Sequence, residues 1–62
     1  MSKEIYDAIR MADYHVNNAE ELVDSGQRDG ADVEIGMANM YANIARVKAT
    51  RLDMYFRHKQ DS

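Results

Sequence analysis

The most constraining feature of this sequence is a short polar segment, residues 25–31, that separates two long stretches in which apolar residues recur with a helical period. Gly26 can adopt the left-handed backbone conformation that commonly ends a helix. Polar residues bounded by glycine are typical of the connection between two antiparallel helices. The sequence therefore predicts an all-α fold, a two-helix antiparallel hairpin.

The hairpin is expected to form one domain, because 62 residues are enough for only one small core. Ser2 is the expected N-cap of the first helix, and Asp29 or Asp32 can cap the second. Gly36 indicates either a frayed first turn or a close approach of the helices. Within domain 1–62, the expected elements are a first helix at about 3–24, a turn at 25–31 and a second helix at about 32–59.

The first helix carries one apolar seam with the spacing of a heptad repeat. Its members are separated alternately by four and three residues: Ile5, Ile9, Ala12, Val16, Ala19 and Val23. Ala8, Met11 and Leu22 widen this seam on one flank. A stripe of this width is typical of a helix that packs against a neighbour, and we expect the second helix to cover it.

The second helix carries two apolar stripes that lie side by side, with Tyr41, Lys48 and Tyr55 between them. Large side chains form the first stripe, which Arg51 interrupts: Val33, Met37, Met40, Ile44, Val47 and Met54. Alanines dominate the second stripe: Ala38, Ala42, Ala45, Ala49, Leu52 and Phe56. Together the stripes cover more than half of the helix surface, so we expect this helix to be buried on two sides.

A partner is therefore expected. The chain has no cysteine, so disulfides cannot stabilise so small a core. Residues from Met54 onward extend past the start of the first helix, where nothing in their own chain covers them. Twofold homodimers are the commonest oligomers, and four antiparallel helices form a common bundle. The sequence thus predicts a homodimeric four-helix bundle, and a heteromeric bundle with another protein is the competing interpretation.

The interface with this partner is expected on the second helix. Its predicted residues combine both stripes and the aromatic end of the helix: Met37, Ala38, Tyr41, Ile44, Ala45, Ala49, Leu52, Tyr55 and Phe56. Small side chains among them permit close approach of two backbones, and the large ones supply apolar area.

Charge divides unevenly along the chain, whose net charge is −3. Residues 1–34 carry a balance of −6 and residues 35–62 a balance of +3, so the two halves neutralise each other in an antiparallel hairpin. The alternative is a basic strip that binds nucleic acid, with possible contacts at Arg46, Lys48, Arg51, Arg57 and Lys59. An acidic chain is atypical of nucleic-acid binders, so a small nucleic-acid-binding homodimer is the second hypothesis.

Two polar side chains lie close to the apolar stripes. His15 is expected near Tyr41, either hydrogen-bonded and half-buried or acting as a pH-sensitive element of an interface, because histidine titrates near neutrality. Lys48 is expected to pack its stem and extend its amine to Asp13 or Glu4.

No catalytic, cofactor-binding or metal-binding pattern is found in the sequence, so we expect neither an enzyme nor a cofactor. No stretch reaches the roughly 20 apolar residues of a membrane span, and the first residues do not resemble a signal peptide. A cytoplasmic protein without a membrane partner is expected.

The segments Ala19-Glu20-Glu21-Leu22-Val23 and Ile35-Gly36-Met37-Ala38-Asn39-Met40-Tyr41-Ala42-Asn43-Ile44-Ala45 resemble those of short two-helix proteins of unknown function from actinobacteria and their phages. The resemblance covers residues 12–52 and implies a helical hairpin without a catalytic signature. The size and layout also resemble a plasmid-encoded RNA-binding hairpin dimer, but no motif matches, so RNA binding is not implied.

The leading hypothesis is a non-enzymatic protein–protein interaction module that assembles through its second helix into a helical bundle. A small phage-type regulator or inhibitor of a host protein would fit this description.

Overall fold

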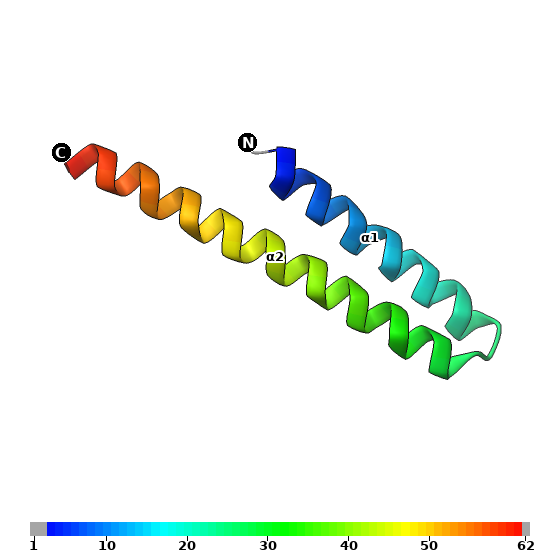
Figure 1. The fold of residues 1–62 in the computed structure, drawn as a ribbon. Helices are drawn as coiled ribbons and strands as arrows, with labels where there is room; N and C mark the ends of the chain where they lie inside the picture. Colours follow the sequence, from blue (N-terminus) through cyan, green and yellow to red (C-terminus); the bar gives the residue numbers. More distant parts are fainter. Residues whose placement is uncertain (1–2, 62) are drawn as a thin grey trace.

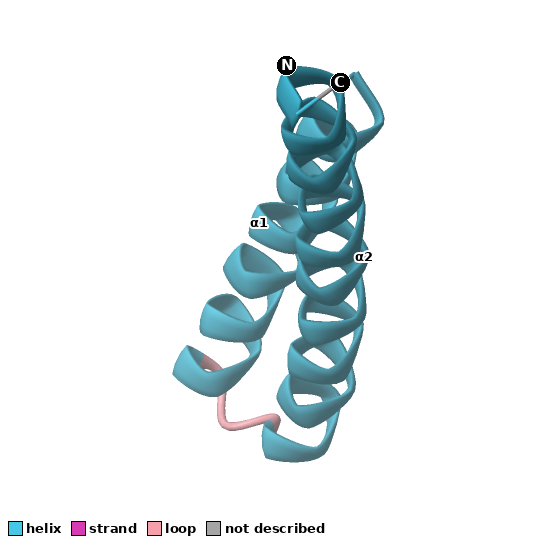
Figure 2. Ribbon diagram, turned by 90° about the vertical axis from the view of Figure 1, so that its left-hand side faces the viewer, coloured by secondary structure: helices cyan, strands magenta, loops and turns pink. Residues whose placement is uncertain are grey.

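A computed structural model describes residues 3–61 of the chain. Two helices, α1 (Lys3–Asp24) and α2 (Arg28–Asp61), account for nearly all of these residues, and none of them forms a strand. The helices run antiparallel and lie side by side along the length of α1 (Figure 1). Their axes cross at a shallow angle (Figure 2), and the whole forms a rod of 55 × 16 × 11 Å. The predicted all-α hairpin is confirmed.

The end of α1 follows from the conformation of Gly26, whose φ is +78°. The Gly26 N–H donates to the Val23 carbonyl at 3.0 Å, and the Gln27 N–H donates to the Leu22 carbonyl at 2.8 Å. This pair of bonds is the Schellman motif, which satisfies carbonyls that would otherwise lack partners at the helix end. The observed bounds of α1 coincide with the expected ones, although Ser2, the expected N-cap, lies outside the described residues.

The second helix begins at Arg28, four residues before its expected start, so the turn spans only 25–27. The Ala31 N–H donates to the Gln27 carbonyl at 3.1 Å, which is the first bond of α2. The Schellman motif reverses the chain within three residues, so the polar residues that follow are free to be helical. Asp29 lies in the first turn of α2, where its negative charge interacts favourably with the positive end of the helix dipole.

The close approach of the helices is at Gly30 rather than at Gly36. A Cβ added at Gly30 would lie 3.3 Å from Cδ1 of Leu22, whereas a Cβ at Gly36 would have no neighbour within 4 Å. Gly36 is helical and exposed, so neither interpretation drawn from the sequence applies to it.

A narrow contact, here called the alanine seam, joins the two helices. Its buried apolar members are Ile5, Ala8 and Ala19 of α1 and Ala31, Ala38 and Ala45 of α2. His15 is also buried in the seam, and Leu22, Tyr41 and Leu52 are half-buried along it. No large side chain among the described residues is fully buried. The seam therefore brings the backbones together but buries little apolar surface.

The seam of α1 differs from the predicted one. Ile9, Val16 and Val23 were expected in it, but they are 42%, 43% and 52% exposed. A heptad built on positions 5, 12 and 19 can take its second member from 8, 15 and 22 or from 9, 16 and 23. The first set contains Ala8, which suits the close approach that the alanines of α2 permit. The larger β-branched side chains consequently lie at the edge of the contact.

Candidate interaction surface

A polar cluster around His15 lies within the alanine seam. Nδ1 of His15 is 2.5 Å from a carboxylate oxygen of Glu34. The imidazole ring stacks on the Tyr41 ring, with the two centroids 5.6 Å apart and the two planes at 9°. The Tyr14 ring makes a T-shaped contact with the imidazole, with the centroids 5.2 Å apart. A carboxylate only accepts, so the N–H at Nδ1 of His15 donates this hydrogen bond. Nε2 of His15 is buried and has no hydrogen-bond partner among the described residues. The predicted role of His15 as a pH-sensitive element of an interface stays a prediction.

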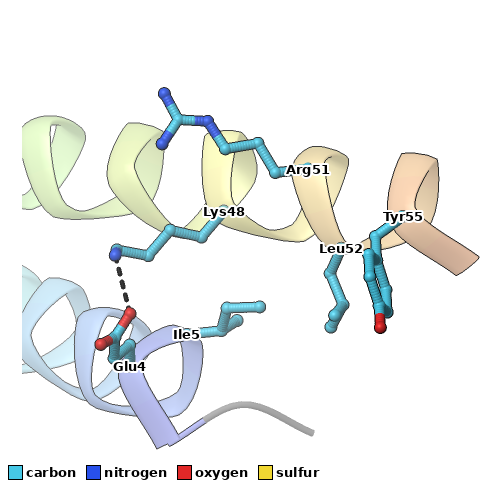
Figure 3. A pocket seen from close by; sticks show the side chains of 6 residues that line it. All are labelled: Glu4, Ile5, Lys48, Arg51, Leu52 and Tyr55. Carbon is cyan, nitrogen blue, oxygen red and sulfur yellow. Dashed lines mark hydrogen bonds and ion pairs between the residues drawn. The ribbon is translucent and has the colours of Figure 1, made fainter.

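A second polar contact joins the open end of the hairpin, where α1 begins. Nζ of Lys48 donates to Glu4 at 2.9 Å, so of the two acids that the sequence predicts, Asp13 and Glu4, Glu4 is the partner (Figure 3). This hydrogen bond and the lysine charge hold the pKa of the Glu4 carboxyl below its usual value. The contact borders a shallow pocket of about 320 Å³, whose lining residues are Glu4, Ile5, Lys48, Arg51, Leu52 and Tyr55.

One face of the hairpin carries an apolar lane on each helix, and it is here called the groove face. On each helix the lane is the heptad row that follows, by one residue, a row facing the other helix. Because the two helices are antiparallel, both lanes lie on the same side of the hairpin. The lanes are Ile9, Val16 and Val23 on α1 and Ile35, Ala42, Ala49 and Phe56 on α2. All seven side chains are exposed.

The groove face is hollowed near the turn. A pocket of about 410 Å³ lies there between the two helices. Its lining combines apolar side chains from both lanes with acidic ones: Val16, Ala19, Glu20, Val23, Asp24 and Ile35. The hollow is thus an apolar groove with an acidic rim.

The opposite side of α2 carries a second exposed apolar strip, here called the outer ridge. Its members are Met37, Met40, Ile44 and Val47, which are 36–50% exposed. The adjoining positions of α1 are Glu4, Met11 and Asn18, of which only Met11 is apolar. The outer ridge therefore belongs almost wholly to one helix.

The last residues of α2 extend beyond α1 (Figure 1), because Ile5, near the start of α1, packs against Leu52. In this overhang, residues 53–61, the exposed apolar side chains are Met54, Tyr55 and Phe56, with exposures of 63%, 54% and 54%. The Tyr55 and Phe56 rings meet edge to face at 5.7 Å. An aromatic cluster with so little cover is typical of an interaction site.

The predicted interface residues divide into two groups. Ala38 and Ala45 are buried in the alanine seam, with Tyr41 and Leu52 half-buried beside them, so these four have little surface to offer a partner. The others are exposed: Met37, Ile44, Ala49, Tyr55 and Phe56. Sequence reasoning missed the rest of the groove face. The sequence signal for this face is the heptad row of α1 that adjoins the seam, and that row was predicted to be the seam itself.

The basic residues of α2 lie around the helix rather than on one side. Arg57 pairs with Asp53 at 3.2 Å, Arg46 donates to Asn43 at 2.7 Å, and Nζ of Lys59 lies 5.5 Å from the Tyr55 ring. Lys48 binds Glu4, Arg51 lines the same pocket, and nucleic-acid binding by these residues stays a prediction. No metal-binding group of His, Cys, Asp or Glu is found within residues 3–61.

No family model, curated protein or solved structure matches this chain. The resemblance to short actinobacterial and phage hairpins therefore stays a prediction. Neither helix, over the residues that the structure describes, is long and apolar enough to cross a membrane.

Proposed function

We propose that this chain is a non-enzymatic protein–protein interaction module that assembles through α2 into a helical bundle, in its simplest form a homodimer of hairpins. The observation that carries the proposal is the division of apolar residues between interior and surface. Alanines make up most of the buried apolar contact between α1 and α2, while most of the large apolar side chains of both helices lie exposed beside it.

The energetics of the isolated hairpin support this proposal. Burial of apolar surface stabilises a fold by about 25 cal/mol per Å², and alanine has little surface to bury. A core of this size rarely contributes more than roughly 3–5 kcal/mol, and the chain has neither a disulfide nor a group of metal ligands within residues 3–61 to add to it. Association with another helical surface supplies the missing burial.

The groove face suits a four-helix bundle better than the outer ridge does. In such a bundle every helix contributes apolar side chains to the shared core. On the groove face α1 contributes Ile9, Val16 and Val23, whereas beside the outer ridge it contributes only Met11. A regulator or inhibitor that acts on another protein would use the surface that the bundle leaves exposed.

A pair of neighbouring substitutions tests the proposal. Ala49→Glu places a charge on the groove face, and Thr50→Glu places the same charge one residue later on the outer side of α2. Light scattering coupled to size exclusion, at micromolar concentration, should show a dimer for the wild type and for Thr50→Glu and a monomer for Ala49→Glu. Equal masses for the two variants would contradict a role of the groove face in assembly.

A further inference from the structure

We infer, on the basis of the proposed homodimer, that two copies pair antiparallel through the groove face in one defined register. In this register Ala42 of one copy lies against Ala49 of its partner, and Phe56 enters the groove beside the partner's Ile35. Four features converge on this arrangement: the sizes of the lane residues, the length of α2, the uncovered overhang with the hollow near the turn, and the distribution of charge.

The lane of α2 on the groove face is symmetric in size. Reading along the helix, its residues are Ile35, Ala42, Ala49 and Phe56, each seven positions after the last. An antiparallel pair centred between Ala42 and Ala49 therefore matches each alanine with an alanine and each large side chain with a large one. The small central residues let the two helices approach closely, and the large ones fill the space towards each end.

The length of α2 favours the same register, because this register makes the ends of the two α2 helices nearly level. Phe56 lies five residues before Asp61, the last residue of α2, and Ile35 lies seven residues after Arg28, the first. At about 1.5 Å per residue, each side chain is thus roughly 8–10 Å from one end of the helix. Two antiparallel copies with nearly level ends consequently place Phe56 over the partner's Ile35.

The groove that receives Phe56 is the hollow near the turn. Val16 and Val23 line it from α1 and Ile35 lines it from α2. The overhang has no cover in its own hairpin, and the hollow lies at the opposite end of the molecule. Antiparallel pairing therefore covers the overhang and fills the hollow in a single contact, and twofold symmetry makes that contact twice.

Charge is separated along the length of the hairpin in a way that favours the same pairing. The turn end, residues 17–35, holds six acidic residues and one basic residue, a balance of −5. The open end, residues 3–10 with 46–61, holds seven basic and four acidic residues, a balance of +3. Antiparallel copies place each basic end beside an acidic one, including Glu20 and Asp24 at the groove rim. A parallel pair would place like charges together.

Cysteine crosslinking tests the register, because the chain has no cysteine of its own. Ala42→Cys and Ala49→Cys are prepared separately, then mixed, dissociated, reassociated and oxidised. In the proposed register, residue 42 lies next to the partner's residue 49. Two copies of residue 42 are about 10 Å apart along the axis, as are two copies of residue 49, which is too far for a disulfide.

The expected result is a covalent dimer in the mixture and not in either variant alone. Each reduced variant should first be shown to keep its helical circular dichroism and its dimer mass. If the reduced variants are dimers but the mixture crosslinks no better than each variant alone, the register is wrong and the proposed function stands. If the wild-type chain is a folded monomer, the proposed function fails together with the register.

Discussion

Among the residues whose burial the structure describes, His15 is the one buried polar residue, and it lies in the alanine seam. It links the helices twice, through a hydrogen bond to Glu34 and through a stacked contact with Tyr41. A hydrogen bond to a charged group stabilises a fold by about 1.5–3 kcal/mol, which is a large share of the stability of so small a chain. The polar cluster therefore fixes how α1 is rotated against α2.

We expect His15→Ala to lower the free energy of unfolding by about 2–3 kcal/mol, because it leaves a gap in the seam and a carboxylate without its donor. Glu34→Gln keeps an acceptor for Nδ1 and should cost less than half as much. Urea denaturation followed by circular dichroism, at one fixed protein concentration, measures both. Equal losses for the two variants would contradict a packing role for the imidazole.

The contact between Lys48 and Glu4 predicts how the pKa of the Glu4 carboxyl responds to substitution of the lysine. Lys48→Met should return the pKa of Glu4 to its ordinary value, because the hydrogen bond and the neighbouring charge both disappear. Lys59→Met, which removes a lysine elsewhere, serves as the control and should leave that pKa lowered. Carbon-detected NMR of the Glu4 carboxyl gives the midpoint in each variant.

The sign of the associated stability follows from the lowered pKa of Glu4. The contribution of this pair is present above the pKa of Glu4 in the unfolded chain and is lost as the pH falls through the lowered value in the folded chain. An unchanged midpoint in Lys48→Met would mean that the contact does not persist in solution.

Sequence reasoning found part of each polar contact. Antiparallel pairing predicts that His15 lies near Tyr41 and that Lys48 reaches Asp13 or Glu4, and the structure shows the contact with Tyr41 and the bond to Glu4. The bond to Glu34 was not predicted. It depends on which of two neighbouring rows of α1 enters the seam, and heptad spacing leaves that choice open.

The two helices are delimited by signals that the sequence contains. Gly26 ends α1 through its left-handed conformation, and its position was predicted for that reason. The start of α2 was placed too late, because polar residues after the turn were interpreted as a longer connection. The predicted rotation of α1 about its axis was wrong. The predicted stripe and the observed contact share Ile5, Ala12 and Ala19, so these residues do not distinguish the two rotations.

The same substitution to alanine should have opposite effects at Gly26 and at Gly36. Gly26→Ala should destabilise the hairpin by about 1 kcal/mol, because an L side chain is strained at φ +78°. Gly36→Ala should stabilise it by up to about 1 kcal/mol, because the site is helical and open. Thermal unfolding of both variants provides the comparison, and a destabilised Gly36→Ala would show that another surface packs against this position.

The overhang of α2 provides a matched pair for the proposed dimer. Phe56 lies on the groove face, whereas Met54 lies on the side of the outer ridge, and both are more than half exposed in the hairpin. Phe56→Ala should weaken the dimer by about 1.4 kcal/mol or more, tenfold in the dissociation constant, and Met54→Ala should have little effect. Analytical ultracentrifugation measures both constants, and the reverse order would assign the interface to the outer ridge.

The hairpin as a whole is a rod that separates charge between its ends and leaves large apolar side chains exposed on two sides. Composition and periodicity predicted the hairpin itself, because each helix has its own local signals. They could not predict which face stays open, because that depends on how closely the alanines draw the helices together. The groove face carries Ile9, Val16 and Val23 because the neighbouring row of α1, with Ala8, enters the seam.

The most direct test of this account is the mass of the unmodified chain in solution at micromolar concentration, measured by sedimentation equilibrium together with its helical content. We predict a helical species with twice the 7.1 kDa mass of one chain, which unfolds as it dissociates on dilution. A fully helical, stable species of 7.1 kDa would contradict it, because the exposed lanes would then need no partner.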